Sequence, residues 1–200
     1  MRWLFARHAE STANAAGLAV GRAEAPLTER GRAQAVALAA SLRDEPLTRV
    51  LCSPQPRAVQ TLAGMDRAPT WFVPALRERS LGAWEGRSLA ALRDDSEWET
   101  RALSWWGAPP RGEALADVAA RAVEALSART DAPSTLVVAH AGVLRVVLGL
   151  LDELPFEAIG RLRVPHAVAQ LRDVDVTRWE RVQQRLSAEA ARWAARPRTQ

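Results

Sequence analysis

Arg7 and His8 are the first residues in the chain whose types together suggest chemistry. They follow a short apolar run at 2–6 and precede a polar loop of small residues. A neutral imidazole nitrogen attacks phosphorus readily near neutral pH, and the planar arginine fork suits phosphate oxygens. An Arg-His pair at a strand end is often exposed to solvent and has no function. Further polar residues elsewhere in the chain are therefore needed to support a site at Arg7 and His8.

Three later apolar segments are predicted strands, and each is followed by polar side chains. In chain order these are 48–52 with Ser53 and Arg57, 71–73 with Glu78, and 135–139 with His140. The carboxyl ends of parallel strands meet at one edge of a sheet, so these groups are expected to share a pocket with His8. Phosphoryl transfer needs such a set: a nucleophile, positive donors around the phosphoryl oxygens and an acid for the leaving oxygen.

The strands alternate with segments that have helical periodicity. Thr28 suits a helix N-cap, and Pro56 suits the first turn of the next helix. Further helices are expected at 89–101, 113–130, 143–151 and 187–196, and two edge strands at 167–172 and 178–183. This order predicts an α/β fold, a single three-layer α/β/α domain with a mostly parallel central sheet.

Residues 79–112 differ in character from the rest and are rich in tryptophan, glycine, proline and charge. We call this segment the excursion and expect it to leave the sheet as a small lid. Its tryptophans are expected to serve packing more than recognition, with a place in the lining of a substrate mouth as the alternative for Trp105 and Trp106. The domain is expected to span 1–186, followed by a C-terminal helix and tail at 187–200.

Composition argues against several classes of protein. The 200 residues have a net charge of +4, and all 27 basic residues are arginines, scattered among 23 acidic residues without a basic run. A nucleic-acid partner is therefore not expected. No apolar stretch reaches the roughly 18 residues of a membrane span, Arg7 and His8 interrupt any secretory signal, and the single Cys52 allows no disulfide framework. A cytoplasmic protein without membrane attachment is expected.

Five segments, in order, resemble the histidine phosphatase superfamily, which includes cofactor-dependent phosphoglycerate mutases and many small phosphatases. They are ARHAESTAN (6–14), EAPLTERGRAQA (24–35), CSPQPRAVQT (52–61), LRERSLGAWEG (76–86) and VVAHAGVLR (137–145). Each segment is moderately specific, and together they span the chain apart from its tail.

The resemblance implies a two-step phosphoryl transfer without a metal or another cofactor. His8 would attack phosphorus and carry a phosphohistidine intermediate, while Glu78 would protonate the leaving alcohol and then activate water. Gly142 would let the chain turn tightly after His140. The groups that bind the phosphorylated substrate would be Arg7, Arg57 and His140, with Asn14 as a further polar contact.

Some assignments within the matched segments compete with others. Glu78 follows the family's leucine-arginine pair and is therefore preferred as the acid over Glu10, Glu85 and Glu113. We interpret His166 as structural or close to the rim; because it stands where many relatives carry asparagine, contact with a ligand is the weaker alternative. Ala9 replaces a frequent glycine, but no charged group of the site is lost.

The length of the excursion separates the functional hypotheses. It is shorter than the insertion that closes the pocket of genuine mutases, so water should reach the phosphoenzyme. The leading hypothesis is a phosphatase that acts on a phosphomonoester of a small acidic metabolite. A phosphoglycerate mutase is the alternative, and a non-catalytic member that binds a phosphorylated ligand is the third. A homodimer is left open, because the C-terminal segment could pack on its own sheet or on a neighbour.

Overall fold

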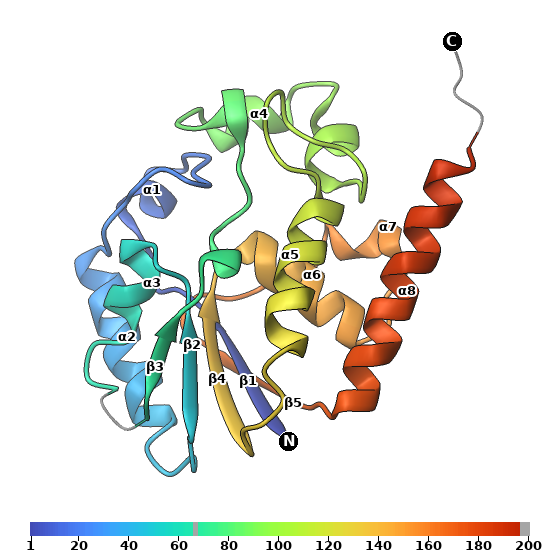
Figure 1. Cartoon of the computed structure of the whole chain (residues 1–200). Helices are drawn as coiled ribbons and strands as arrows, with labels where there is room; N and C mark the ends of the chain where they lie inside the picture. Colours follow the sequence, from blue (N-terminus) through green and yellow to red (C-terminus); the bar gives the residue numbers. More distant parts are fainter. Residues whose placement is uncertain (66–67, 197–200) are drawn as a thin grey trace.

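A five-stranded sheet, in the order β3-β2-β4-β1-β5, forms the centre of the computed structural model, which describes residues 1–65 and 68–196 (Figure 1). The strands are β1 (Arg2–Arg7), β2 (Arg49–Cys52), β3 (Thr70–Phe72), β4 (Ser134–Ala139) and β5 (Ala169–Asp173). The first four run parallel, and β5 pairs antiparallel with β1. The expected mostly parallel sheet is confirmed.

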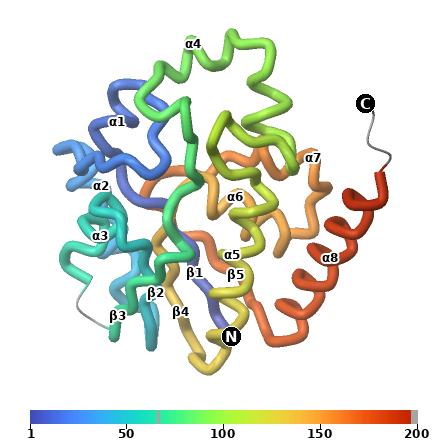
Figure 2. Tube along the Cα trace, turned by 45° about the horizontal axis from the view of Figure 1, so that its top comes forward, coloured from blue at the N-terminus to red at the C-terminus, as the bar shows by residue number. Residues whose placement is uncertain are grey.

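Helices cover both faces of the sheet (Figures 1 and 2). They are α1 (Thr12–Ala15), α2 (Glu29–Ser41), α3 (Pro56–Thr61), α4 (Leu89–Arg93), α5 (Leu115–Ser127), α6 (Ala141–Leu151), α7 (Phe156–Ile159) and α8 (Val176–Ala194). Trp3 and Phe5 of β1 pack in the core with α5, α6 and α8, whereas Leu4 and Ala6 pack with α2 and α3. Successive side chains of a strand point to opposite faces, and this alternation builds the three layers.

The C-terminal region is helical where a second edge strand was expected. The strand expected at 178–183 is wrong, because these residues lie in α8, and residues 186 and 187 continue the same helix. Asp175 caps α8 by accepting a backbone N–H at 2.7 Å. Trp179 and Val182 are buried three positions apart, which is a helical spacing. Within the described residues, no helix is long and apolar enough to span a membrane.

The excursion lies over the carboxyl ends of the parallel strands, at the top of Figure 1. Only short helical pieces form in it: a 3₁₀ turn at Gly82–Trp84, α4, and a π turn at Glu99–Leu103. The helix expected at 89–101 is thus interrupted, because the Asp95 carboxylate accepts the N–H of Glu97 at 2.9 Å and forms a turn. The excursion is a folded loop with short helical pieces and not one long helix.

Candidate active site

The carboxyl edge of the sheet brings the predicted catalytic side chains together. They follow successive strands: Arg7 and His8 at the end of β1, Arg57 in α3 after β2, Glu78 beyond β3, and His140 after β4. The ring centroids of His8 and His140 are 5.0 Å apart. Arg7 and Glu78 line the same cavity. Residues that are distant in sequence therefore meet in one place.

The backbone and the imidazole of His8 are both fixed by hydrogen bonds. Its N–H donates to Ala139 O in β4 at 2.8 Å, and the N–H of Ala9 donates to Thr61 Oγ1 at 2.9 Å. His8 Nδ1 lies 2.7 Å from Ala9 O. A carbonyl oxygen only accepts, so Nδ1 must carry the proton and Nε2 keeps its lone pair. Nε2 is the nucleophilic atom that this arrangement offers.

His140 is fully buried and has the opposite tautomer. Arg57 Nε can only donate, so His140 Nδ1 accepts from it at 3.2 Å, and Nε2–H donates to Ser53 Oγ at 2.8 Å. The terminal nitrogens of Arg57 donate to backbone oxygens before α2, those of Gly21 and Ala23. Each terminal nitrogen of Arg57 keeps one further N–H for a ligand, whereas His140 would have to share its proton with Ser53.

Burial and neighbouring cations favour the neutral form of both histidines. The pKa of His8 lies well below 6.5 because its ring is desolvated and because Arg7 and Arg57 are close. The pKa of His140 is lowered in the same way, by burial first and then by His8 and the two arginines. Burial lowers the pKa of Arg7 to about 10, so this arginine stays charged at neutral pH. Burial raises the pKa of the Cys52 thiol to about 12, which leaves it unreactive.

These shifts predict that acid destabilises the protein below about pH 6.5. Unfolded histidines take up protons near 6.5, but the folded His8 and His140 do so only at much lower pH. The unfolded state therefore binds more protons in this window, and each buried histidine costs up to about 1.4 kcal/mol per pH unit as the pH falls. Urea unfolding at pH 7.5 and 5.5 measures the loss, which should be smaller in a His8→Ala variant. Equal free energies of unfolding at both pH values would contradict the prediction.

The Glu78 carboxylate is held against the start of α6. Both of its oxygens accept the N–H of Gly142 at 3.1 Å, and Oε1 also accepts the N–H of Arg79 at 2.8 Å. The backbone N–H of Glu78 donates to Gln55 Oε1 at 2.6 Å, and Gln55 Nε2 donates to Gly21 O at 2.9 Å. Glu78 therefore has a fixed position at the edge of the cavity.

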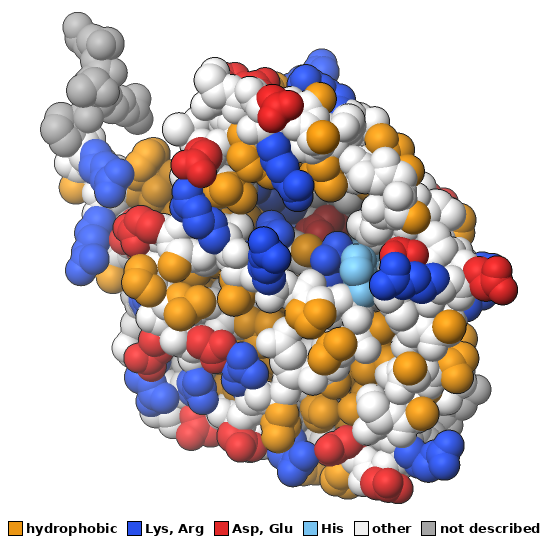
Figure 3. Space-filling model, turned by 180° about the vertical axis from the view of Figure 1, so that it is seen from behind, with side chains coloured by type: hydrophobic (Ala, Val, Ile, Leu, Met, Phe, Trp, Pro, Cys, Tyr) orange, Lys and Arg blue, Asp and Glu red, His pale blue; other side chains and the backbone are white. Residues whose placement is uncertain are grey.

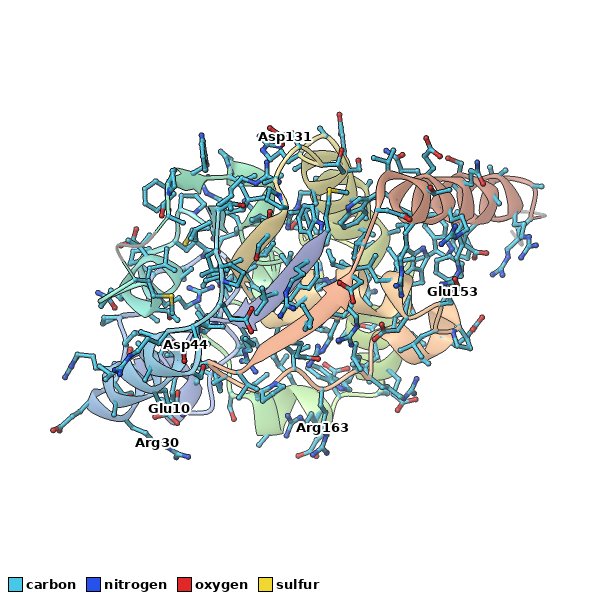
Figure 4. All side chains as sticks on the ribbon, turned by 90° about the horizontal axis from the view of Figure 1, so that it is seen from below. Glu10, Arg30, Asp44, Asp131, Glu153 and Arg163 are labelled. Carbon is cyan, nitrogen blue, oxygen red and sulfur yellow. The ribbon has the colours of Figure 1, made fainter. Side chains whose placement is uncertain are left out.

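The three competing carboxylates serve the scaffold instead. Glu85 accepts backbone N–H groups of the loop before α2, and Glu113 pairs with two arginines and one backbone N–H. Glu10 lies 3.5 Å from Arg30 on α2, and the two are neighbours in Figure 4. Among the residues that line the cavity, Glu78 is the one carboxylate in the described part of the chain.

Gly142 lies in the first turn of α6, and its backbone does not have a positive φ. The expectation that it permits a tight turn is therefore wrong. A Cβ at this position would lie 2.5 Å from Glu78 Oε1, so the glycine makes room for the carboxylate on its N–H.

A Gly142→Ala substitution is expected to lower kcat/KM at least about tenfold, because it displaces the Glu78 carboxylate. Helix propensity favours alanine by about 1 kcal/mol, so stability should change little. Gly149→Ala in the same helix is the control, since its Cβ would press on Ile159 at 2.8 Å and not on Glu78. That control should lose stability and keep its activity. Steady-state kinetics and urea unfolding check both variants, and an unchanged kcat/KM for Gly142→Ala would contradict the assigned contact.

The cavity that Arg7 and Glu78 line has a volume of about 640 Å³. His8, Arg57 and His140 are buried and are not among the residues that line it. Figure 3 shows a hollow on this molecular face, ringed by arginine side chains, with acidic atoms deep inside it. Asn14 lines the cavity, and its Oδ1 accepts from the N–H and hydroxyl of Ser11, which leaves the amide N–H groups for a ligand. Apolar side chains of the excursion form another wall: Leu81, Trp84, Leu89, Leu92, Trp98 and Leu103.

Trp105 and Trp106 do not line this cavity; they serve packing, which was the preferred of the two interpretations. Trp105 packs on Phe156 of α7 at a centroid distance of 4.6 Å, and Trp106 stacks on Trp193 of α8 at 5.1 Å. These contacts attach the excursion to the C-terminal helices. The tryptophans that do line the cavity are Trp84 and Trp98, which come earlier in the sequence.

Two residues near the site have contacts that the sequence did not indicate. Arg79 is buried, and its guanidinium donates to backbone oxygens of the excursion, those of Arg101, Ala102, Gly107 and Glu113. His166 Nδ1 donates to His8 O at 2.9 Å, and its ring meets that of His8 edge-on at 5.5 Å. His166 thus contacts His8 directly, and its structural role in holding the His8 backbone agrees with one of the two interpretations given for it. The position of His166 directly after a proline does not by itself predict a contact with His8.

Known proteins match both the sequence and the structure. The family model of the histidine phosphatase superfamily, branch 1, matches residues 3–189. The adenosylcobalamin/alpha-ribazole phosphatase of Salmonella typhimurium is 37% identical over 174 residues, which is 82% of this chain and 86% of that protein. A probable phosphoglycerate mutase GpmB of Erwinia tasmaniensis is 32% identical over 79% of this chain and 78% of its own length.

The crystal structure of the alpha-ribazole phosphatase from Shigella flexneri has a TM-score of 0.74 and 30% identity, and the match covers 88% of this chain and 91% of that one. The family model spans nearly the whole chain and includes all the residues gathered at the sheet edge. The chain therefore belongs to the histidine phosphatase superfamily, branch 1, whose members include enzymes that hydrolyse phosphomonoesters.

Proposed function

We propose that this phosphatase hydrolyses a phosphomonoester of a small acidic metabolite through a phosphohistidine on His8. The hydrogen bond from His8 Nδ1 to Ala9 O carries the proposal, because it leaves the Nε2 lone pair free beside two arginines. Arg7 and Arg57 bind the phosphoryl oxygens, and His140 shares its Nε2 proton between Ser53 and the same group. The positive charges offset the negative charge of the transferred phosphoryl group.

The reaction proceeds in two displacements. His8 Nε2 forms a bond to phosphorus as the bond to the leaving oxygen breaks, and a protonated Glu78 carboxyl gives its proton to that oxygen. In the second step a water oxygen forms a bond to phosphorus, the bond to Nε2 breaks, and the Glu78 carboxylate takes the proton of the water. Free phosphate and the enzyme's starting state result. All groups in this scheme are side chains, so EDTA should not inhibit.

Phosphate release from a panel of compounds, with EDTA present, tests the proposal. The panel contains p-nitrophenyl phosphate, 3-phosphoglycerate and α-ribazole 5′-phosphate, the last because relatives are named for it. We expect release from at least one metabolite at a higher kcat/KM than from p-nitrophenyl phosphate. Conversion of 3-phosphoglycerate into 2-phosphoglycerate faster than phosphate release would favour a mutase and contradict the proposal.

A further inference from the structure

The cavity carries more positive charge than one phosphoryl group requires. The guanidinium of Arg79 lines the cavity as well, but it donates to four backbone oxygens of the excursion. Besides Arg7 and Arg79, three arginines line the cavity whose side chains form no ion pair with a carboxylate of residues 1–65 and 68–196: Arg93, Arg145 and Arg163. Glu78 is the one carboxyl group among the described residues that line the same cavity. A phosphomonoester without a further charge would leave most of this positive charge without a partner.

Arg145 is the most informative of the three. It lies in α6, and its Nε donates to Leu162 O at 2.8 Å, which fixes the direction of the side chain. In the described part of the chain, its two terminal nitrogens have no hydrogen-bond partner, although the residue is half-buried. A partly desolvated guanidinium without a partner is unfavourable and is a ready binding group for a planar anion.

Arg145 shares the cavity wall with Arg7 at the sheet edge and with Arg93 of the excursion. Arg7 lies at the end of β1, Arg145 in α6, and Arg93 at the end of α4 in the excursion. The three guanidinium groups thus extend from the phosphoryl-binding end toward the excursion.

We propose that Arg145 and Arg93 bind a second anionic group of the substrate, a carboxylate or a second phosphate, beyond the phosphoryl group that is transferred. The proposal rests on the function proposed above and adds which part of the cavity recognises the acidic group. Arg93 brings its side chain from the excursion, so the second anion would contact both the excursion and α6. The apolar wall of the excursion then contacts the carbon skeleton between the two charges.

Matched substrate pairs test this second site. Glycerol 3-phosphate and 3-phosphoglycerate differ only in a hydroxymethyl group against a carboxylate, and fructose 6-phosphate and fructose 1,6-bisphosphate differ by a second phosphate. We expect kcat/KM to be at least about tenfold higher for the charged member of one pair, which identifies the anion. Arg145→Gln should reduce that ratio about tenfold. Arg192→Gln, on the exposed part of α8, is the matched control and should keep it.

Binding without turnover separates this proposal from the proposed function. Calorimetric titration of both pairs into a His8→Ala variant measures the preference for the second anion directly. Equal affinities within both pairs, or an Arg145→Gln variant with an unchanged ratio, would overturn the second site. Absence of hydrolysis in the wild type, with preferential binding of the charged members, would overturn the proposed phosphatase reaction and support the second site.

Discussion

A His8→Ala variant is expected to lose at least about four orders of magnitude in kcat/KM for every phosphomonoester, because the covalent route is removed. His140 cannot replace the lost atom, because both of its ring nitrogens are hydrogen-bonded, to Arg57 and Ser53. His166 is held by its own bond to the backbone, since its Nδ1 donates to the His8 carbonyl, and its ring centroid lies 5.5 Å from that of His8. The loss should not depend on the leaving group, since both reaction steps pass through His8 Nε2.

Trapping of the intermediate gives an independent measurement for the same residue. Wild-type protein mixed with a ³²P-labelled substrate and quenched in alkali should retain label that is released by acid, as a phosphohistidine does. His8→Ala should retain none. His166→Asn is the matched control, because asparagine keeps an N–H donor for the His8 carbonyl, and its labelling should persist. Label in the His8→Ala variant would refute the assignment.

The same variant is expected to fold. Its circular dichroism spectrum should match that of the wild type, and its unfolding free energy should fall less steeply with acid, because one buried neutral histidine is gone. If the variant lost its structure, the loss of activity would not support the covalent mechanism. Activity and folding of the His8→Ala variant must therefore be measured on the same preparation.

The strand ends were predictable from sequence because they combine two strong local signals. An apolar run such as the one at 135–139 reads as a buried strand, and His140 directly after it stands at the edge where ligands bind in α/β sheets. The structure places this histidine at the N-terminus of α6, as the pattern indicates. Periodicity and strand ends were enough to predict which side chains meet.

What the sequence could not indicate depends on contacts between distant segments. The segment at 178–183 contains apolar residues that suit a short strand, and only their packing against α5 makes the helix evident. The sequence around Arg145 predicts only a residue of a helix, and its place in the cavity wall is seen only in the structure. The position of Trp84 and Trp98 in the cavity wall likewise depends on how the excursion folds back, which Arg79 fixes through backbone oxygens that no pattern reveals.

A Glu78→Gln variant is expected to separate the two steps of the reaction. Glutamine keeps an oxygen that can accept the N–H groups of Gly142 and Arg79, so the local structure should persist. It cannot give a proton to a leaving alkoxide, so kcat/KM for alkyl phosphates should fall by about 10²–10⁴. The phenolate of p-nitrophenyl phosphate needs little protonation, so kcat/KM for this compound should fall by less than about tenfold.

The second step makes a further demand on Glu78. Hydrolysis of the phosphoenzyme needs the carboxylate as base whichever substrate formed it, so kcat for p-nitrophenyl phosphate should fall even where kcat/KM does not. Rapid mixing should then show a burst of p-nitrophenol equal to the enzyme concentration, followed by slow turnover. Glu113→Gln is the matched control. Its carboxylate binds Arg121 and the backbone N–H of Ser80 and does not line the cavity. The substitution should therefore change kcat/KM equally for both kinds of substrate and give no burst. Equal losses of kcat/KM for alkyl and aryl phosphates in Glu78→Gln would mean that another group protonates the leaving oxygen, and the hydrogen bonds of Glu78 to α6 would then be structural.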